Sequence, residues 1–359
     1  MKRGPAMERR RRAAGAAVLA AALTLAAACS SEPAGQSSTT AGTASTETVT
    51  TGLDAPWSVA FHDGTPLISE RGSARILELD AEGNVRGIGT IGGTAGGGEG
   101  GLLGIAVQDG FIYSYATAGG ENRIERRELT GSKGSLGLGP AEAILGGIAA
   151  GPVHNGGRIA FGPDGMLYAT TGDAGNRGSA QDTESLSGKI LRLTPDGAVP
   201  EDNPFPGSLV YSYGHRNPQG IAWDAEGTLY SSEFGQNTWD ELNVIEAGGN
   251  YGWPEVEGMA GRDGFIDPVQ QWKPAEASPS GIAVAEESIF IANLRGEQLR
   301  EVPMADLRTS TGYLTGEHGR LRDVVTTPDG SLWVLTNNTD GRGRPGPDDD
   351  RILHVGVGG

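Results

Sequence analysis

The chain has 359 residues, 60 of them glycine, and its 28 lysines and arginines against 45 aspartates and glutamates give a formal net charge of −17 at pH 7. A chain this acidic does not attract nucleic acid through its general field, but it suits cations. Abundant glycine without a long amphipathic helical pattern after the first 30 residues favours a turn-rich, all-β domain.

The first 28 residues have the pattern of a lipoprotein signal peptide. Basic residues within 1–12 precede an apolar stretch, Ala13–Ala28, that is too short and too rich in alanine for a membrane span. The single cysteine, Cys29, follows where a lipid would be attached; ordinary cleavage nearby with an unmodified thiol is the alternative. We therefore expect export and a lipid anchor at the outer face of the cytoplasmic membrane, with residues 29–48 as a flexible Ser/Thr/Ala-rich tether.

A short pattern recurs six times: a hydrophobic strand, a turn on Asp-Gly or an acidic equivalent, and a second hydrophobic strand. Asp-Gly between two alternating apolar runs predicts a β-hairpin. The turn positions lie 46, 55, 62, 60 and 43 residues apart, which fits the four-stranded blades of a β-propeller. These positions are Gly64, Gly110, Gly165, Gly227, Glu287 and Gly330.

A further apolar segment follows each hairpin and predicts the third strand of a blade. Fourth strands are expected at Arg86–Ile91, Ala141–Leu145 and Ser208–Tyr213. The last blade lacks one, and Glu47–Leu53 can supply it, which closes a six-bladed ring without a bare sheet edge. We therefore expect residues 49–359 to form one six-bladed β-propeller; an open β-sandwich with accidental repetition is the alternative.

Arginines gather at places that begin or end a repeat. Arg216 lies just before the fourth hairpin, Arg295 ends the fifth, and Arg320 and Arg322 alternate, so they point to one side of an extended strand. A propeller brings these segments to one face, where guanidinium groups suit carboxylates and phosphates. The alternative is surface salt bridging to the many acidic residues.

Two histidines, His154 and His215, stand at blade entrances, and glycines around His154 allow close approach of a ligand. A histidine there can act as a general base, or it can be structural and bonded to the backbone. Residues 232–254 combine carboxylates with irregular, glycine-rich backbone, which suits Ca²⁺ or a solvated acidic loop.

Several motifs together resemble the soluble PQQ-dependent glucose/sorbosone dehydrogenases, in particular the aldose sugar dehydrogenases. The motifs are GEGGLLGIA, HNGGRIAFGPDG, TTGDAGN, GHRNPQGIAW, DELNVIEAGGNYGWP and GRLRDVVTTPDGSLWVLTNN. The match runs from about residue 50 to the C-terminus. It implies a six-bladed β-propeller that uses PQQ and Ca²⁺ to oxidise C1 of an aldose to the lactone, with electrons passed to an external quinone or cytochrome.

The resemblance implies roles for individual residues. His154 matches the base that takes the proton of the anomeric hydroxyl, Arg216 the residue that polarises the PQQ quinone oxygen, and Asp173 a loop lining the substrate mouth. The matches to cofactor contacts are Glu99, Asn217, Gln219, Arg295, Arg320 and Arg322. The matches to Ca²⁺ ligands are the carbonyls of Gly235 and Gln236, with Glu241 and Tyr251 at a second, structural ion.

Some of these positions depart from the family pattern: Gln236 replaces a common proline, and Arg295 stands where a lysine often does. Glu99 stands where the family often has glutamine. A second carboxylate beside PQQ is unfavourable unless it is protonated or paired with an arginine.

Three functions follow from these observations. The first is a PQQ- and Ca²⁺-dependent aldose dehydrogenase, acting as a monomer or weak dimer. The second is a non-enzymatic cell-surface propeller that binds a glycan or a protein, although such a protein has no reason to keep His154, Arg216, Arg320 and Arg322 together. The third is a Ca²⁺-dependent lactone hydrolase, which calls for carboxylates rather than arginines around the axis.

Overall fold

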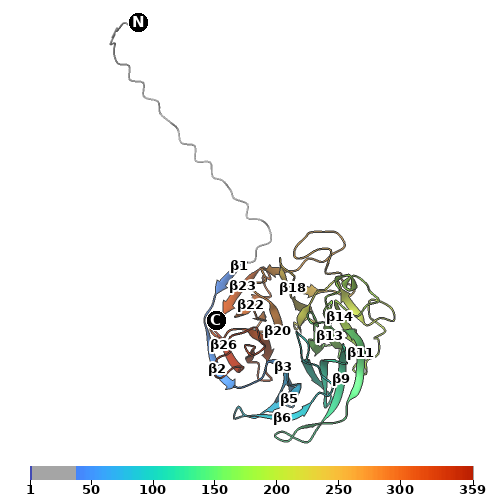
Figure 1. Ribbon diagram of the computed structural model, residues 1–359, viewed down its shortest axis with the longest axis vertical. Coiled ribbons are helices and arrows are strands. Elements are labelled where there is room, and N and C mark those ends of the chain that lie inside the picture. Colours follow the sequence, from blue (N-terminus) through green and yellow to red (C-terminus); the bar gives the residue numbers. More distant parts are fainter. Residues whose placement is uncertain (2–37, 359) are drawn as a thin grey trace. The chain divides into compact units, whose positions relative to one another are not determined.

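The computed structural model describes Met1 and residues 38–358. Within residues 38–358, twenty-six strands form six blades around a central axis, and the one helix is the short 3-10 helix η1 (Arg177–Ala180) (Figure 1). All strand pairs within the blades are antiparallel except the one that β1 (Ser38–Ala41) makes. The predicted all-β, six-bladed propeller is confirmed. The predicted signal peptide and Cys29 lie outside the described residues, and no helix within the described part is long and apolar enough to cross a membrane.

Each blade is built from strands that are consecutive in the chain, except that blades 5 and 6 each add one strand from the N-terminal side. The first strands of neighbouring blades contact one another around the axis. Blade 1 consists of β3 (Pro56–His62), β4 (Thr65–Glu70), β5 (Arg75–Leu79) and β6 (Val85–Thr90). Blade 2 consists of β7 (Leu102–Gln108), β8 (Phe111–Ala118), β9 (Glu121–Thr130), β10 (Gly137–Leu138) and β11 (Glu142–Ala149). Blade 3 consists of β12 (Ile159–Phe161), β13 (Leu167–Thr171), β14 (Lys189–Leu193) and β15 (Val210–Tyr213). Blade 4 consists of β16 (Pro218–Trp223), β17 (Leu229–Glu233), β18 (Asp240–Ile245) and β19 (Gln270–Trp272). Blade 5 consists of β20 (Pro279–Ala285), β21 (Ser288–Asn293), β22 (Gln298–Pro303), β23 (Thr309–Tyr313) and β1 (Ser38–Ala41). Blade 6 consists of β24 (Leu321–Thr326), β25 (Leu332–Thr336), β26 (Ile352–Val357) and β2 (Ala44–Thr50).

The repeated turns are the predicted hairpins. His62 pairs with Thr65 across a two-residue loop in which Asp63 (φ 47°) and Gly64 (φ 75°) both have positive φ. Positive φ at both central residues is what a type I′ turn requires, and its twist matches that of the flanking strands. The fifth hairpin uses Glu286–Glu287 with φ of 48° and 62°, so the acidic equivalent adopts the same conformation.

The ring is closed by a strand from the N-terminal side, as predicted, but the bounds differ. β2 pairs antiparallel with β26, from Ala44 opposite Val357 to Thr50 opposite Ile352, so it begins before the predicted Glu47. β1 adds a parallel fifth strand to β23 in blade 5. The prediction of a tether over 29–48 is therefore wrong for residues 38–48, because threonine-rich segments there find strand partners at the far end of the chain.

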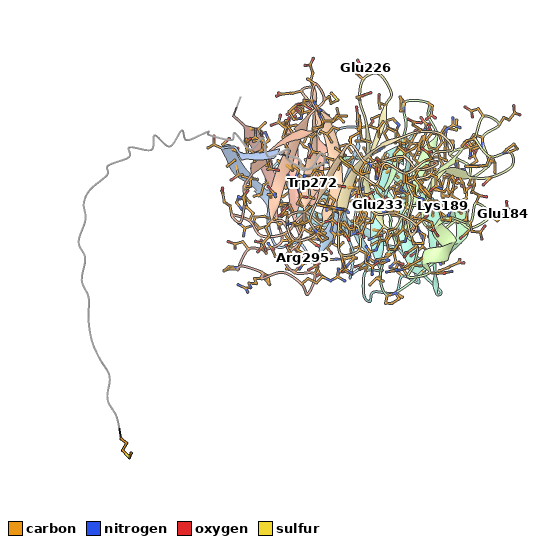
Figure 2. The ribbon with its side chains drawn as sticks, turned by 90° about the horizontal axis from the view of Figure 1, so that it is seen from above. Glu184, Lys189, Glu226, Glu233, Trp272 and Arg295 are labelled. Carbon is orange, nitrogen blue, oxygen red and sulfur yellow. The ribbon has the colours of Figure 1, made fainter. Side chains whose placement is uncertain are left out.

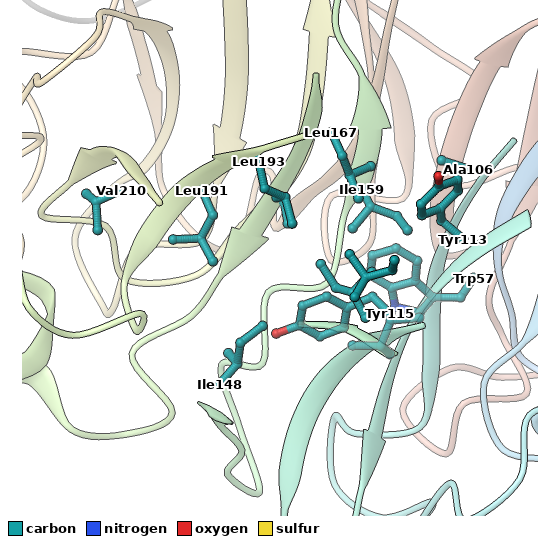
Figure 3. Packing of buried hydrophobic residues seen from close by; sticks show 14 residues of the cluster. Trp57, Ala106, Tyr113, Tyr115, Ile148, Ile159, Leu167, Leu191, Leu193 and Val210 are labelled. Carbon is teal, nitrogen blue, oxygen red and sulfur yellow. The ribbon is translucent and has the colours of Figure 1, made fainter. Parts of the chain in front are cut away.

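Apolar side chains fill the space between adjacent blades. Among the described residues, six buried clusters occur, one at each interface between neighbouring blades. Figure 3 shows the cluster between blades 2 and 3, where Tyr115 lies among Ile148, Ile159 and Leu191. The hydroxyl of Tyr115 donates to the carbonyl of Asn155 at 2.9 Å, which ties this core to the segment that carries His154.

Candidate active site

The predicted site residues within 38–358 lie on one face of the ring. Most occupy the connections between blades or the loops between second and third strands. The exceptions are Gln219, Glu241 and Arg322, each the second residue of a strand, and Tyr251, which lies in the loop between the third and fourth strands of blade 4. Figure 2 shows Glu226, in the turn after β16, and Arg295, in the loop after β21, on opposite faces. The Asp-Gly hairpins therefore lie on the face opposite the candidate site.

His154 is held by a buried carboxylate. Its Nδ1 lies 2.7 Å from Oδ1 of Asp173, and the side chain of Asp173 is 0 % exposed, against 16 % for His154. The other carboxylate oxygen, Oδ2, accepts a hydrogen bond from Trp253 Nε1 at 2.9 Å. Within residues 38–358 no group bonds to Nε2 of His154, so this nitrogen is free to exchange a proton while Asp173 fixes the tautomer.

Asp173 was expected to lie in a loop lining the substrate mouth. Its carboxylate has no exposed surface and lies against the imidazole of His154. Burial opposes ionisation of Asp173, but hydrogen bonds from His154, Gly175 and Trp253 outweigh that cost and lower its pKa. An ionised Asp173 stabilises positive charge on the imidazole.

Arg216 lies beside this pair and is fixed by Glu233. The backbone N–H groups of Arg216 and Asn217 both donate to Oε1 of Glu233, whose Oε2 lies 2.8 Å from Nδ1 of His215. The guanidinium donates to the carbonyls of Phe234 and Gly235 and lies 5.4 Å from the centre of the Trp253 ring. His215 is 0 % exposed, so the second blade-entrance histidine is structural.

The other predicted arginines surround the axis. Arg322 is buried and donates to Oε1 of Gln219 at 2.8 Å and to Oδ1 of Asn337 at 3.0 Å. Arg320 contacts Asp340 at 3.3 Å. Burial, together with the neighbouring charge of Arg71, lowers the pKa of Arg322. Within residues 38–358, Arg322 is buried without an ion pair of its own, an environment that favours an anionic ligand.

The remaining predicted cofactor contacts, Glu99, Asn217 and Arg295, have different hydrogen-bond partners and different exposure to solvent. Glu99 forms an ion pair with Arg342 at 3.2 Å, the pairing that its carboxylate requires beside an anionic cofactor. Asn217 accepts the N–H of Gly156 at 3.0 Å, while its own amide nitrogen is buried without a partner in the described structure. Arg295 is exposed on the same face, and its side chain makes no hydrogen bond or ion pair with other residues of 38–358.

Three of the four predicted metal ligands, Gly235, Glu241 and Tyr251, line a small cavity of about 10 Å³, together with Glu233 and Glu257 among others; Gln236 is not part of its lining. Burial, and then the charge of Glu233, raise the pKa of Glu241 to about 8. Its carboxylate accepts the N–H of Gly258 at 2.7 Å. The Tyr251 hydroxyl is already engaged, since it donates to the carbonyl of Val244 at 2.6 Å.

Of the two backbone carbonyls predicted to hold the first Ca²⁺, that of Gly235 accepts from Arg216. At Gln236 it is the side-chain amide oxygen that accepts a hydrogen bond, from Arg177. Among residues 38–358, no three His, Cys, Asp or Glu side chains are arranged to hold a metal by themselves. An ion here would therefore depend on backbone carbonyls as well as carboxylates, which is chemistry that Ca²⁺ accepts.

Sequence reasoning missed Trp253, Arg71 and Arg342 as members of the site. Trp253 stands in the GNYGWP motif, but its contact with Asp173 crosses 80 residues. Arg71 donates to the carbonyl of Asp340 at 3.3 Å from the loop after β4. The only advance signals were the GNYGWP motif for Trp253 and, for Arg71 and Arg342, a position in a loop between the second and third strands of a blade.

Comparison with known proteins agrees with this geometry. The family model described as glucose/sorbosone dehydrogenase matches residues 53–344. The chain belongs to the glucose/sorbosone dehydrogenase family. The chain is thus a sugar oxidoreductase by family, which leaves the non-enzymatic propeller without support.

Members of this family with solved structures or curated sequences resemble the chain closely. The PQQ-bound form of an aldose sugar dehydrogenase from Streptomyces coelicolor is 50% identical, with a TM-score of 0.84, and the match covers 88% of this chain and 98% of that one. The aldose sugar dehydrogenase YliI of Escherichia coli is 35% identical over 217 residues, 52% of this chain and 58% of that protein. Quinoprotein glucose dehydrogenase B of Acinetobacter calcoaceticus is 33% identical over 241 residues, 56% of this chain and 50% of that protein.

Proposed function

We propose that the chain is a PQQ- and Ca²⁺-dependent dehydrogenase that oxidises C1 of aldose sugars to the lactone. The observation that carries the proposal is the His154–Asp173 pair, held at 2.7 Å on the same face as Arg216, Arg320 and Arg322. A base oriented by an ionised carboxylate beside an arginine cluster suits oxidation of an alcohol with an anionic cofactor.

The residues present fit PQQ. The donor nitrogens Arg216 Nε, Asn217 Nδ2 and Arg320 Nε are buried without partners in the described part of the chain, and an acceptor-rich ligand would satisfy them. PQQ carries several carboxylates, for which Arg320 and Arg322 supply charge. When bound, it would supply a quinone carbon that accepts the hydride from C1 of the sugar.

The cavity beside Arg216 fits a Ca²⁺ ion in its ligand chemistry. Glu241, Glu233 and Glu257 offer oxygen ligands, and a cation would offset the cost of keeping their charges in a confined space. The ion would require the carbonyl of Gly235 to exchange Arg216 for the metal.

The chain's own residues then have defined roles. Nε2 of His154 takes the proton from the anomeric hydroxyl as C1 becomes a carbonyl, and Asp173 holds the imidazolium that results. Arg216 supplies positive charge beside the reacting centre. Electrons then pass to an external quinone or cytochrome, and Cys29 would anchor the protein outside the cytoplasmic membrane.

The proposal is tested by dye-linked oxidation of a panel of aldoses by purified protein, before and after addition of PQQ with Ca²⁺. Activity that appears only after reconstitution is the expected result. If PQQ neither binds, as measured by calorimetry, nor supports turnover, the proposed cofactor and reaction are wrong.

A further inference from the structure

Glu99 makes two hydrogen bonds to the segment that carries His154, and we call these two bonds together the clamp. Its backbone N–H donates to the carbonyl of Pro152 at 3.0 Å, and its Oε2 accepts the N–H of His154 at 2.8 Å. The neighbouring Gly98 has a φ of 56°, and a Cβ there would lie 2.2 Å from the carbonyl oxygen of Pro152. Only glycine therefore lets the loop before β7 approach closely enough for both contacts.

His154 needs such support because its backbone is strained. Its φ of 57° lies in the left-handed region, which a non-glycine residue keeps only when its surroundings enforce it. The enforcing contacts are three: Glu99 on its N–H, Ala174 on its carbonyl at 3.1 Å, and Asp173 on Nδ1. Within residues 38–358, Glu99 is the one residue whose side chain bonds to the His154 backbone, so a substitution can remove this contact.

Glu99 brings a negative charge that the site must balance. Its side chain is 16 % exposed and its Oε1 lies 3.2 Å from Nη2 of Arg342, whose side chain is 45 % exposed. The backbone of Arg342 is fixed in turn, since its N–H donates to Oδ1 of Asp340 at 2.9 Å. Both oxygens of Glu99 are thus occupied, one by the base's backbone and one by an arginine.

We propose that Glu99 is a positioning residue for His154 rather than a direct cofactor contact, and that Arg342 neutralises its charge so that an anionic cofactor can bind nearby. The identity of the base and the cofactor rests on the proposed function; the clamp on His154 rests on the geometry alone. Glutamine at position 99 keeps an acceptor for the His154 N–H, whereas alanine removes it.

The first test needs no cofactor. Hydrogen exchange at the His154 amide is measured in the purified protein and in the Glu99→Gln and Glu99→Ala variants. We expect exchange about 10- to 100-fold faster in Glu99→Ala than in wild type, because a hydrogen bond to a charged acceptor is lost, and near-wild-type exchange in Glu99→Gln. Equal protection in all three proteins would overturn the clamp.

The second test separates positioning from cofactor binding. In the PQQ- and Ca²⁺-loaded enzyme, Glu99→Ala should lower kcat about 10-fold or more without weakening PQQ binding, and Glu99→Gln should restore most of kcat. Arg342→Ala should weaken PQQ binding on the order of 10-fold, because the charge of Glu99 is then uncompensated, and Glu99→Gln in the same chain should restore it.

The control is Arg308→Ala, which breaks an exposed ion pair with Asp306 and should change neither quantity. Loss of PQQ affinity in Glu99→Ala with unchanged kcat would make Glu99 a cofactor ligand and overturn the proposal. A wild-type protein that bound no PQQ would contradict the proposed function instead, and the exchange measurement would still decide the clamp.

Discussion

Replacing Asp173 with asparagine should disable the base while leaving the cofactor site intact. Asp173 accepts hydrogen bonds from His154, Trp253 and Gly175, each to an ionised oxygen. Asparagine removes the charge and turns one oxygen into a donor, which then faces another N–H. If the imidazolium loses about 2–4 kcal/mol of stabilisation, kcat falls by about 30- to 1,000-fold.

The effect of Asp173→Asn on the free energy of unfolding should also depend on pH. Since the pKa of Asp173 is lowered in the folded protein, its stabilising effect is present above the unfolded value of about 4 and is lost as pH falls through the folded pKa. Asp173→Asn should therefore be less stable than wild type by about 2 kcal/mol at pH 7, and the difference should shrink at pH 3 to 4.

The assays are steady-state kinetics of the loaded enzyme, calorimetry of PQQ binding and denaturant unfolding at both pH values. Asp306→Asn is the matched control, because that carboxylate pairs only with the exposed Arg308 and with backbone of its own turn. A kcat within threefold of wild type for Asp173→Asn, with full PQQ occupancy, would refute the role given to the His154–Asp173 pair.

Four further outcomes are expected. Trp253→Phe keeps the ring but removes its donor to Asp173, so kcat should fall about 10-fold with unchanged PQQ affinity. Lys189→Met leaves three buried carbonyls without the ammonium that they now bond, which should lower the free energy of unfolding by about 3 kcal/mol in denaturant titrations. Removing the residues before 51 deletes β1 and β2 and exposes the edge of β26, so the Tm should fall by at least about 5 °C. Chelation should lower the Tm reversibly in wild type, and Glu241→Gln should abolish that response to Ca²⁺.

The fold was largely readable from the sequence because its signals are local. A two-residue loop such as Asp63–Gly64 fixes a hairpin through the φ values it permits. Six hairpins at blade spacing, three with two-residue loops and three with five-residue loops, leave few architectures. The strands before Thr50 were harder to predict. Their serines and threonines show little apolar alternation, and their partners lie about 270 to 310 residues away.

The types of residue in the candidate site could be predicted from the sequence, but the contacts between them could not. Glycines around His154 and arginines at blade entrances predicted the right face of the ring. The partner of His154 did not follow from the sequence, since Asp173 reaches it from another loop and is itself bonded by Trp253 from a third. Likewise, Glu99 was identified as an unusual carboxylate, but its bond to the backbone of His154 depends on a close approach that only the folded ring creates.

The most direct test of the central claim is rapid mixing of PQQ- and Ca²⁺-loaded protein with an aldose that wild type oxidises, in the absence of any electron acceptor. Reduction of the cofactor is followed by absorbance in wild type and in His154→Ala. The account predicts a rapid single turnover in wild type and a rate at least about 100-fold lower in His154→Ala at equal PQQ occupancy. Equal rates in the two proteins would show that His154 is not the base.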